Sequence, residues 1–360
     1  MNLTNINTIK NLCKEFNIRP SKKLGQNFLI NENILDKIIS ASELKRNDVI
    51  LEIGPGFGVL TMELLKNINN LIVIEKDKRL AEFLRQEIKK YSNKEIKDGV
   101  EIINSDILKI DVGKILQQDP STHNNSKGRS GPSSAKATAD RQAGAYKIIS
   151  NLPYQITSPV LWKFLNEVEN SPAFASKNLN WTTAGRPELM VLMVQKEVAN
   201  RIVSKQGQMS ILSVMCQFYA DCEIISQVPR NNFWPEPEVD SAIIRLKIKK
   251  NKIVSWLHRS AWSHLVQSNK QAPCLPDRQA PKRDGANTAE LFFKVVKIGF
   301  SAKRKMLKNN LSAGLNIPAV EVERILEKVG LNKKVRAQEL SVNKWILLVD
   351  SLKSLVQEKN

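Results

Sequence analysis

The chain has 360 residues, 42% of them hydrophobic, and carries a formal net charge of +19 at pH 7. This length accommodates two domains with full cores, whereas no apolar run approaches the roughly 20 residues of a membrane span. Because the N-terminus also lacks the apolar core of a signal peptide, we expect a folded protein that stays in the cytosol and has no membrane partner.

Short apolar runs alternate with amphipathic stretches between Asp48 and Gln195. This alternation predicts buried parallel strands that are connected by helices. The predicted strands are Val49–Ile53, Leu71–Glu75, Val100–Ile103, Ile148–Asn151 and Met190–Val194. The predicted helices are Leu60–Leu65, Leu80–Ile88, Pro159–Val168 and Val198–Val203. The sequence therefore predicts a doubly wound, Rossmann-like α/β fold.

The pattern changes towards the C-terminus. Glu223–Pro229 and Val239–Ile248 are extended and predict antiparallel strands at one edge of the sheet. After Lys252 the periodicity becomes helical. The helices predicted there are Leu291–Ile298, Lys303–Leu311, Val320–Val329 and Val342–Leu355. We predict an α/β domain over residues 1–250 and a smaller, all-α domain over residues 251–360.

Positive charge is concentrated in part of the predicted helical domain. Residues 251–318 contain 12 Lys and Arg but only 3 Asp and Glu. Such a concentration of positive charge points to a polyanionic partner, most simply a nucleic acid. The alternative interpretation of this positive charge is a solvated face that only aids solubility.

Three stretches fit neither the strand nor the helix pattern. Residues 117–146, 171–187 and 270–288 are rich in small and polar residues and lack an apolar period. We expect them to be surface insertions in the two domains.

The cysteines and histidines do not indicate a metal site. The four cysteines show no C-x-x-C spacing, and the three histidines are scattered. His258, His264 and Cys274 come nearest to a cluster. We expect no metal.

A glycine-rich turn follows the first predicted strand. Gly54, Gly56 and Gly58 stand where a tight turn brings backbone close to a ligand. Glu75 ends the second strand, where a carboxylate can bind both hydroxyls of a ribose, and Asp106 follows the third, where it could reach an adenine amine. A dinucleotide oxidoreductase would instead use Gly-x-Gly-x-x-Gly to hold pyrophosphate. The spacing favours a nucleoside without phosphates, namely S-adenosylmethionine.

The tetrapeptide Asn151-Leu152-Pro153-Tyr154 ends the fourth predicted strand. The Asn151 side-chain oxygen and the Leu152 carbonyl could accept hydrogen bonds from the exocyclic amine of an adenine. Pro153 fixes its own φ and holds Leu152 in an extended turn, and Tyr154 offers a flat face for stacking. Taken alone, this sequence is also compatible with an ordinary turn at the end of a strand.

With these motifs assembled, the chain resembles the ribosomal RNA adenine N6-dimethyltransferases, and among them the bacterial small-subunit enzymes. Lys23–Leu29 resembles the opening cofactor motif of the family, and the glycine turn, the two acids and the tetrapeptide follow in the family's order. Phe233–Ser241 matches its Phe-x-Pro-x-Pro-x-Val-Asp-Ser stretch. Phe300–Lys305 resembles the basic helix that begins the C-terminal domain of the family.

This resemblance implies a class I methyltransferase that uses S-adenosylmethionine. The residues implied to contact or frame the cofactor are Asn27, Leu29, Gly54, Gly56, Glu75, Asp106 and Asn151. The residues implied to handle the target base are Asn151, Leu152, Pro153, Tyr154 and Phe233. The residues implied to bind RNA are Lys22, Lys23, Lys303, Arg304, Lys305 and Lys308.

The implied reaction is direct transfer of methyl groups to N6 of two adjacent adenosines, in a hairpin near the 3′ end of 16S rRNA. The expected partner is this RNA or the immature small ribosomal subunit, and we expect the enzyme to be a monomer. Two alternatives remain at this point. One is an adenine methyltransferase of large-subunit rRNA, of the macrolide-resistance type, and the other is a non-catalytic assembly factor that binds RNA.

Overall fold

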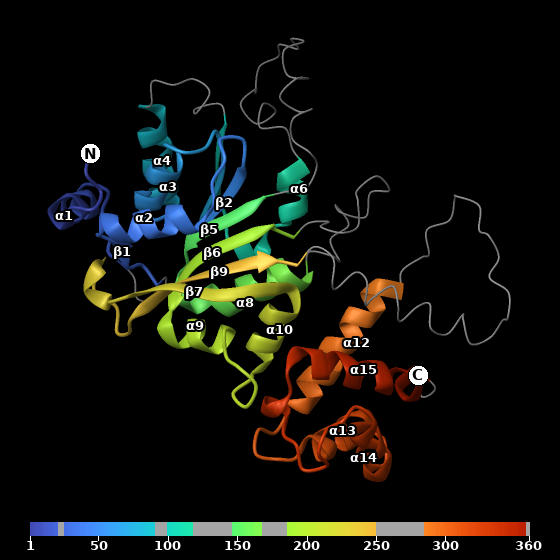
Figure 1. The fold of residues 1–360 in the computed structure, drawn as a ribbon. Helices are drawn as coiled ribbons and strands as arrows, with labels where there is room; N and C mark the ends of the chain where they lie inside the picture. The colour runs from blue at the N-terminus through green and yellow to red at the C-terminus, as the bar shows by residue number, and fades with distance from the viewer. Residues whose placement is uncertain (21–24, 91–98, 118–145, 168–185, 250–283, 358–360) are drawn as a thin grey trace, which may run out of the picture. The chain divides into compact units, whose positions relative to one another are not determined.

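The computed structural model describes residues 1–20, 25–90, 99–117, 146–167, 186–249 and 284–357 (Figure 1). The chain divides into two compact units. Unit 1 comprises residues 1–200 and 221–248, and unit 2 comprises residues 201–220 and 249–360.

The three predicted insertions lie mostly outside the described residues, but their predicted ends were wrong. Tyr146 and Arg186, which the sequence pattern assigns to insertions, are buried because they pack at the start of neighbouring strands. The last predicted insertion extends to residue 288, whereas a helix already begins at Asp284.

Unit 1 is built on a seven-stranded sheet with the order β4-β3-β2-β5-β6-β9-β7. Its strands are β2 (Val49–Ile53), β3 (Asn70–Glu75), β4 (Val100–Asn104), β5 (Lys147–Asn151), β6 (Leu189–Gln195), β7 (Ala220–Val228) and β9 (Ser241–Ile248). Strands β4, β3, β2, β5 and β6 are parallel, and β9 pairs antiparallel with β6. These findings confirm the predicted α/β sheet and the antiparallel addition to its edge.

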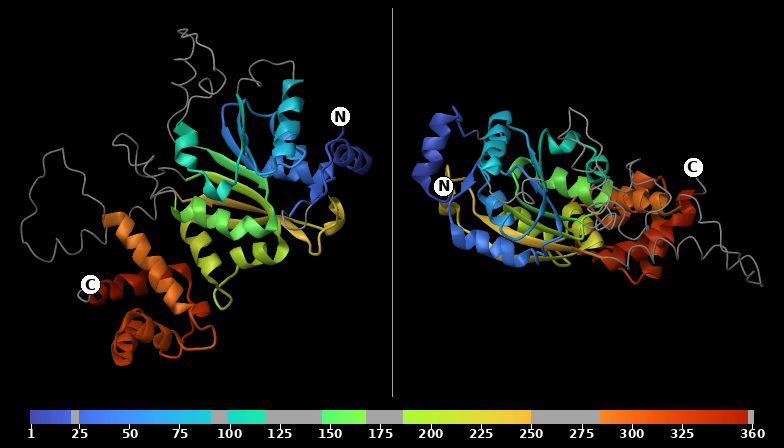
Figure 2. Two further views of the ribbon diagram at one scale, coloured as in Figure 1. Left: turned by 180° about the vertical axis from the view of Figure 1, so that it is seen from behind. Right: turned by 90° about the horizontal axis from the view of Figure 1, so that it is seen from above.

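Helices lie against both faces of this sheet (Figure 2). The α-helices of unit 1 are α1 (Ile6–Glu15), α2 (Glu32–Ala41), α3 (Val59–Leu64), α4 (Lys78–Lys89), α6 (Val112–Gln117), α8 (Thr157–Trp162) and α9 (Lys196–Ile202). The shorter helical turns are η2 (Ile107–Lys109), η4 (Tyr154–Ile156), η5 (Lys163–Glu167) and η8 (Arg230–Asn232). The predicted helix over residues 159–168 is thus divided, because η5 continues α8 as a π-helix. Helices α1 and α2 were not predicted.

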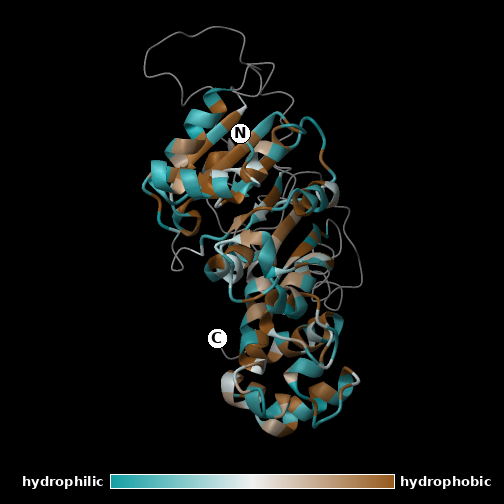
Figure 3. Cartoon of the chain, turned by 90° about the vertical axis from the view of Figure 1, so that its left-hand side faces the viewer, coloured by the Kyte–Doolittle hydropathy of each residue, from teal (hydrophilic) through white to brown (hydrophobic). Residues whose placement is uncertain are grey.

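The strands form because they are continuous apolar runs, as expected where helices cover both faces of a parallel sheet. The centre of the sheet is correspondingly hydrophobic in Figure 3. Side-chain caps define the beginnings of several helices: Asn5 caps α1, Asn31 caps α2 and Asp77 caps α4, each by accepting a backbone N–H.

The order of the parallel strands reverses between β2 and β5, which creates a topological switch point. Backbone pairing between these strands is limited to Ile50 with Lys147 and Leu51 with Ile148. Towards their carboxyl ends the buried Ser150 hydroxyl connects the two strands in place of backbone pairing. It donates to the Ile53 carbonyl and accepts from the Ile53 N–H. The strand ends are therefore held together while the loops that follow them can diverge around a ligand.

A two-stranded ribbon accompanies the main sheet. Strands β1 (Phe28–Leu29) and β8 (Phe233–Trp234) pair antiparallel, with Phe28 opposite Trp234 and Leu29 opposite Phe233. The Asn31 side chain adds a hydrogen bond to Asn232 at 2.7 Å. The ribbon thereby joins two segments that lie far apart in the sequence.

Unit 2 is helical in its described part. Its helices are α10 (Ile211–Tyr219), α12 (Asp284–Gly299), α13 (Leu307–Leu315), α14 (Ala319–Lys328), α15 (Val342–Gln357) and the short η9 (Ala337–Glu339). Its core contains an aromatic cluster in which Phe218 stacks on Phe292 with ring centroids 4.4 Å apart, and Tyr219 and Phe293 pack beside them. None of the helices that the structure describes is long and apolar enough to span a membrane.

The helix predicted over Lys303–Leu311 is confirmed from Leu307 onwards, but the basic helix predicted over Phe300–Lys305 was wrong. Lys303, Arg304 and Lys305 lie in an exposed turn between α12 and α13, and α13 begins only at Leu307. The buried Asn310 side chain donates to the carbonyls of Gly299 and Ala302. These side-chain hydrogen bonds replace helical ones and stabilise the turn.

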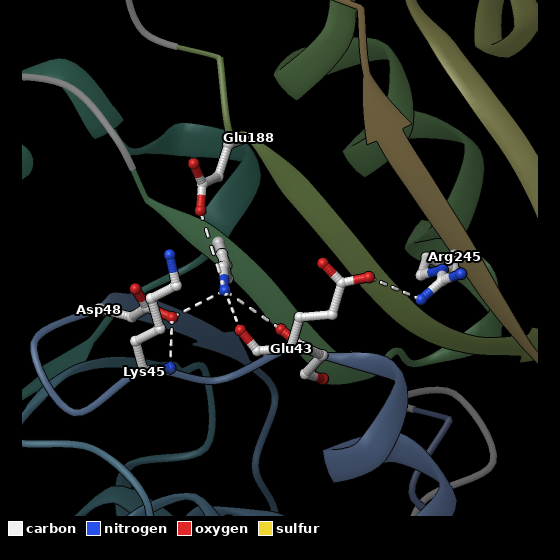
Figure 4. A network of polar contacts seen from close by, with 7 residues as sticks. Glu43, Lys45, Asp48, Glu188 and Arg245 are labelled. Atoms are coloured by element: carbon white, nitrogen blue, oxygen red, sulfur yellow. Dashed lines mark hydrogen bonds and ion pairs between the residues drawn. The ribbon is translucent and has the colours of Figure 1, made fainter.

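A buried ammonium group ties the amino ends of three strands together (Figure 4). Lys147, at the start of β5, donates to the carbonyls of Ser42 and Glu43 and to the Asp48 carboxylate at 2.7 Å. Glu188, just before β6, lies 3.8 Å from the same ammonium. The network extends outwards to Arg245, which pairs with Glu43 and Glu223 near the surface.

We predict that Lys147→Met lowers the free energy of unfolding by about 3 kcal/mol, because the partly buried Asp48 carboxylate and two carbonyls lose the ammonium that they share. Arg245→Met is the matched control in the exposed part of the network and should lower it by less than about 1 kcal/mol. Urea unfolding measures both values. Equal losses would show that the buried ammonium has no special role.

Candidate functional site

A pocket opens at the switch point, beyond the carboxyl ends of β2, β3 and β5. The residues that line it come from six segments and are Gly25, Gln26, Asn27, Phe28, Leu29, Ile38, Glu52, Gly54, Pro55, Gly56, Val59, Leu60, Glu75, Leu80, Asn151, Leu152, Pro153, Tyr154 and Phe233. It thus brings together the predicted base-handling residues and all but one of the predicted cofactor residues.

The glycine turn after β2 is tight, as the sequence predicts. Gly54, Gly56 and Gly58 have φ values of 65°, 63° and 82°, in the left-handed region. A Cβ atom on Gly54 would come within 3.2 Å of the Pro153 ring. A Cβ atom on Gly56 would come within 3.0 Å of the Phe28 ring. Glycine is therefore needed both for the turn and for the packing of neighbouring loops against it.

Glu75 presents a buried carboxylate at the end of β3, with 6% of the residue exposed. Its Oε1 accepts the Asp77 N–H at 2.7 Å and its Oε2 accepts the Gly56 N–H at 3.2 Å. The carboxylate has further lone-pair capacity for a ligand hydroxyl. Burial raises the pKa of Glu75 to about 7, although these two backbone hydrogen bonds favour the charged form.

A second carboxyl group, that of Glu52, lies deeper below the pocket and is 1% exposed. Burial raises its pKa to about 8, and the negative charge of Glu75 raises it further, while the Thr61 hydroxyl, which donates to Oε2 at 2.7 Å, opposes the shift. At neutral pH Glu52 is therefore mostly protonated. The pocket floor holds a neutral acid beside a carboxyl that titrates near neutral pH.

The tetrapeptide forms one wall of the pocket. Asn151 ends β5, and its Nδ2 donates to the Asn27 carbonyl at 3.5 Å. The amide oxygen consequently occupies the other branch of the side chain, where it can accept hydrogen bonds. The Leu152 N–H donates to the Met193 carbonyl of β6 at 3.2 Å, and the Leu152 side chain is buried. The sheet thus fixes the backbone that carries the two predicted acceptors.

Two aromatic rings complete the wall. The Tyr154 hydroxyl hydrogen-bonds to the hydroxyl of Ser241 at 2.6 Å, and Ser241 is fully buried at the start of β9. Burial raises the pKa of Tyr154, so the phenol stays neutral. Phe233 is 3% exposed and is held by its pairing with Leu29. Both rings are therefore positioned before any base enters the pocket.

Some predicted site residues lie elsewhere. Asp106 is outside the pocket lining: it caps η2 through the Leu108 N–H and pairs with Lys76 at 2.9 Å. The Lys308 ammonium is paired with Glu323, whereas Lys303, Arg304 and Lys305 are exposed. The predicted RNA-binding residues Lys22 and Lys23 lie outside the described residues.

Sequence reasoning did not assign roles to three polar residues of this region. Glu52 could have been recognised because an acid at the end of an apolar strand is expensive to bury. Gln26 and Ser241 belong to the motifs that carry the family resemblance, but their contacts depend on distant segments: Gln26 hydrogen-bonds to Asp77 and Ser241 to Tyr154.

Within the described ranges, no group of three or more His, Cys, Asp and Glu side chains is arranged to hold a metal ion. Among the described cysteines, Cys13 and Cys216 are buried and Cys222 is partly exposed. His258, His264 and Cys274 lie outside the described residues.

The sequence matches known proteins over most of its length. Residues 17–269 match the family model of ribosomal RNA adenine dimethylases. The chain is 34% identical to "Ribosomal RNA small subunit methyltransferase A" of Dehalococcoides mccartyi, an alignment that covers 94% of this chain and 90% of the relative. It is 31% identical to the protein of the same name from Clostridioides difficile, with 99% of both chains covered.

Solved structures share the fold. A dimethyladenosine transferase from Plasmodium falciparum has a TM-score of 0.58 at 22% identity, covering 91% of this chain and 97% of that one. The 23S rRNA methyltransferase ErmE has a TM-score of 0.55 at 22% identity, covering 91% of this chain and 100% of that one. At this identity the likeness establishes the class I rRNA methyltransferase fold.

We predict that Glu52 makes the protein less stable as the pH rises. Its pKa of about 8 in the folded state exceeds the ordinary value of 4.5. Between these pH values the folded protein therefore keeps a proton on Glu52 that the unfolded chain has lost. Its stabilising contribution is complete below pH 4.5 and is lost as the pH rises through 8. Between pH 5 and 8, the free energy of unfolding of the parent should fall by on the order of 3 kcal/mol relative to that of Glu52→Gln.

Urea unfolding at several pH values measures this difference, with Glu82→Gln on the exposed face of α4 as the control. Parallel pH profiles for the parent and Glu52→Gln would contradict the burial of a protonated acid.

Proposed function

Because the chain belongs to the ribosomal RNA adenine dimethylase family, we propose that it uses S-adenosylmethionine to dimethylate N6 of two adjacent adenosines in the 3′-terminal hairpin of 16S rRNA. The immature small ribosomal subunit is the proposed partner. The single observation that carries this proposal is the pocket in which the Asn151–Tyr154 wall faces the glycine turn and Glu75.

The pocket residues suit a nucleoside cofactor. Lone pairs left on the Glu75 carboxylate can accept ribose hydroxyls, and the left-handed turn at Gly54 and Gly56 places backbone in the pocket lining. When bound, S-adenosylmethionine supplies an electrophilic methyl group. Asn27 and Leu29 close the pocket from the opposite loop. We assign Asp106 to the adenine end of the cofactor, which requires its pair with Lys76 to open.

Asn151 and Leu152 act on the target amine. The lone pair of an adenine amine is delocalised into the ring, so N6 is a poor nucleophile. Acceptors at Asn151 Oδ1 and the Leu152 carbonyl hold the two N–H groups and favour the tetrahedral amine that can attack. Their contribution is positioning, because the methylated amine is acidic and loses its proton to water without a side-chain base.

Tyr154 and Phe233 compensate for the loss of base stacking. Extruding a base from its stack costs a few kcal/mol, and each aromatic partner can return about 1–3 kcal/mol. The hydrogen bond between Tyr154 and Ser241 fixes one ring, and pairing within the β1–β8 ribbon fixes the other. Since neither ring has to be ordered on binding, most of this stacking energy is available to the substrate.

Positive charge outside the pocket supports RNA binding. We assign phosphate contacts to the exposed turn of Lys303, Arg304 and Lys305, with Lys22 and Lys23 contributing from the N-terminal segment. Lys308 contributes less, because its ammonium is already paired with Glu323.

The decisive test replaces Asn151 in cells that lack the endogenous protein, followed by mass spectrometry of the small-subunit rRNA. In cells, we expect the parent to restore dimethyladenosine. In the purified enzyme, Asn151→Ala should lower the methylation rate about 100-fold. Calorimetry should show that the variant still binds S-adenosylmethionine. Asn33→Ala, on the exposed side of α2, is the control and should behave as the parent. An active Asn151→Ala enzyme would remove Asn151 from the mechanism.

A further inference from the structure

A second recess lies beside the β1–β8 ribbon, away from the pocket at the switch point. It is formed by α1, the segment that follows this helix and Trp234 of β8. Its lining contains Asn7, Lys10, Asn11, Lys14, Arg19 and Trp234. None of these residues lines the first pocket, so the proposed reaction does not use them.

The recess is suited to an anion. Lys10, Lys14 and Arg19 are exposed and bring three positive charges to it. Among the described residues that line it, none has a carboxylate. Lys10 and Lys14 lie four positions apart on α1 and therefore share one face of the helix. Asn7 and Asn11 lie on the same face and add amide groups that both donate and accept hydrogen bonds.

The recess also has an aromatic wall. Trp234 is partly exposed, and the Lys10 ammonium lies 5.9 Å from the centroid of its ring. Such an exposed cation–π contact is weaker than the stacking of a base on an aromatic ring. A base can therefore take the indole face and leave Lys10 to bind the adjoining phosphate.

Strand geometry links this recess to the target-base pocket. Phe233 and Trp234 are neighbours in β8, and successive side chains of a strand point to opposite faces. Phe233 consequently lines the first pocket and Trp234 the second recess. Two rings on adjacent residues can receive two nucleotides that are close together in one RNA strand.

Hydrogen bonds also hold the recess to the cofactor side of the first pocket. The Arg79 guanidinium donates to the Asn17 carbonyl, at the end of α1, at 2.6 Å and to both carboxylate oxygens of Asp77. The Asp77 N–H in turn donates to Glu75. The α1 segment is thus fixed relative to Glu75 and does not need to be ordered by a ligand.

We propose that this recess binds an unpaired nucleotide that flanks the target adenosine, with its base on Trp234 and its phosphate between Lys10 and Lys14. The proposal rests on the proposed function, since it concerns the same RNA substrate. It assigns α1 and Trp234 to substrate specificity, because they would favour adenosines whose neighbour is also free of pairing.

Fluorescence anisotropy tests the proposal with a labelled hairpin RNA that carries two adjacent unpaired adenosines and with a fully paired duplex of the same length. Trp234→Ala should raise the Kd for the hairpin at least fivefold and leave the Kd for the duplex unchanged, whereas Trp234→Phe should retain most of the affinity. The double variant Lys10→Gln/Lys14→Gln should reduce the slope of log Kd against log salt by about 1 to 2.

The matched control is Lys45→Gln/Lys89→Gln, which removes two exposed charges elsewhere on unit 1 and should leave the salt slope for the hairpin unchanged. Calorimetry should give the parent Kd for S-adenosylmethionine in every variant. Because Trp234 also packs against the core, the lysine variant keeps the proposal testable should Trp234→Ala unfold.

The outcomes separate the two proposals. If the parent methylates the hairpin while both variants bind it as the parent does, the recess has no role and the proposed function stands. If the parent fails to methylate RNA, the proposed function falls, and the binding data still decide whether the recess takes an unpaired nucleotide. An equal loss of duplex and hairpin binding would reduce the recess to a general basic surface and overturn the proposal.

Discussion

The site depends on how β2 and β5 are joined at the switch point. Their backbone pairing stops after two residue pairs, and the Ser150 hydroxyl holds the last residues of the strands together. Beyond it, the Pro153 ring packs against Gly54, where a side chain would not fit. This contact sets the distance between the loop proposed to hold the cofactor and the loop proposed to hold the base.

Two buried carboxyl groups lie at this pocket, and burial raises the pKa of both, to about 7 for Glu75 and to about 8 for Glu52. Glu75 accepts two backbone N–H groups, which orient its carboxylate at the end of β3. Glu52 lies beneath it, and its raised pKa keeps it neutral, so the pocket floor does not bury two adjacent negative charges. A cofactor hydroxyl that binds Glu75 would therefore meet an oriented acceptor without strong repulsion from below.

The sequence allowed the central strands to be predicted because buried parallel strands are continuous apolar runs, and the glycine turn because its residues are adjacent. Contacts between distant segments could not be predicted in this way. The bond between Tyr154 and Ser241 requires β9 to pair with β6. The sequence predicts a helix from Lys303, whereas the turn found there is stabilised by two hydrogen bonds from the Asn310 side chain and one from the Lys305 N–H to the Ala302 carbonyl. Helices α1 and α2 could have been found from their Asn caps.

A crystal structure with S-adenosylhomocysteine, the demethylated form of the cofactor, tests the central claim most directly. We expect both ribose hydroxyls to lie within hydrogen-bond distance of Glu75 and the sulfur to face the wall formed by Asn151 and Tyr154. A ligand bound elsewhere, or a sulfur that faces away from this wall, would rule out the proposed reaction and leave only a basic RNA-binding protein.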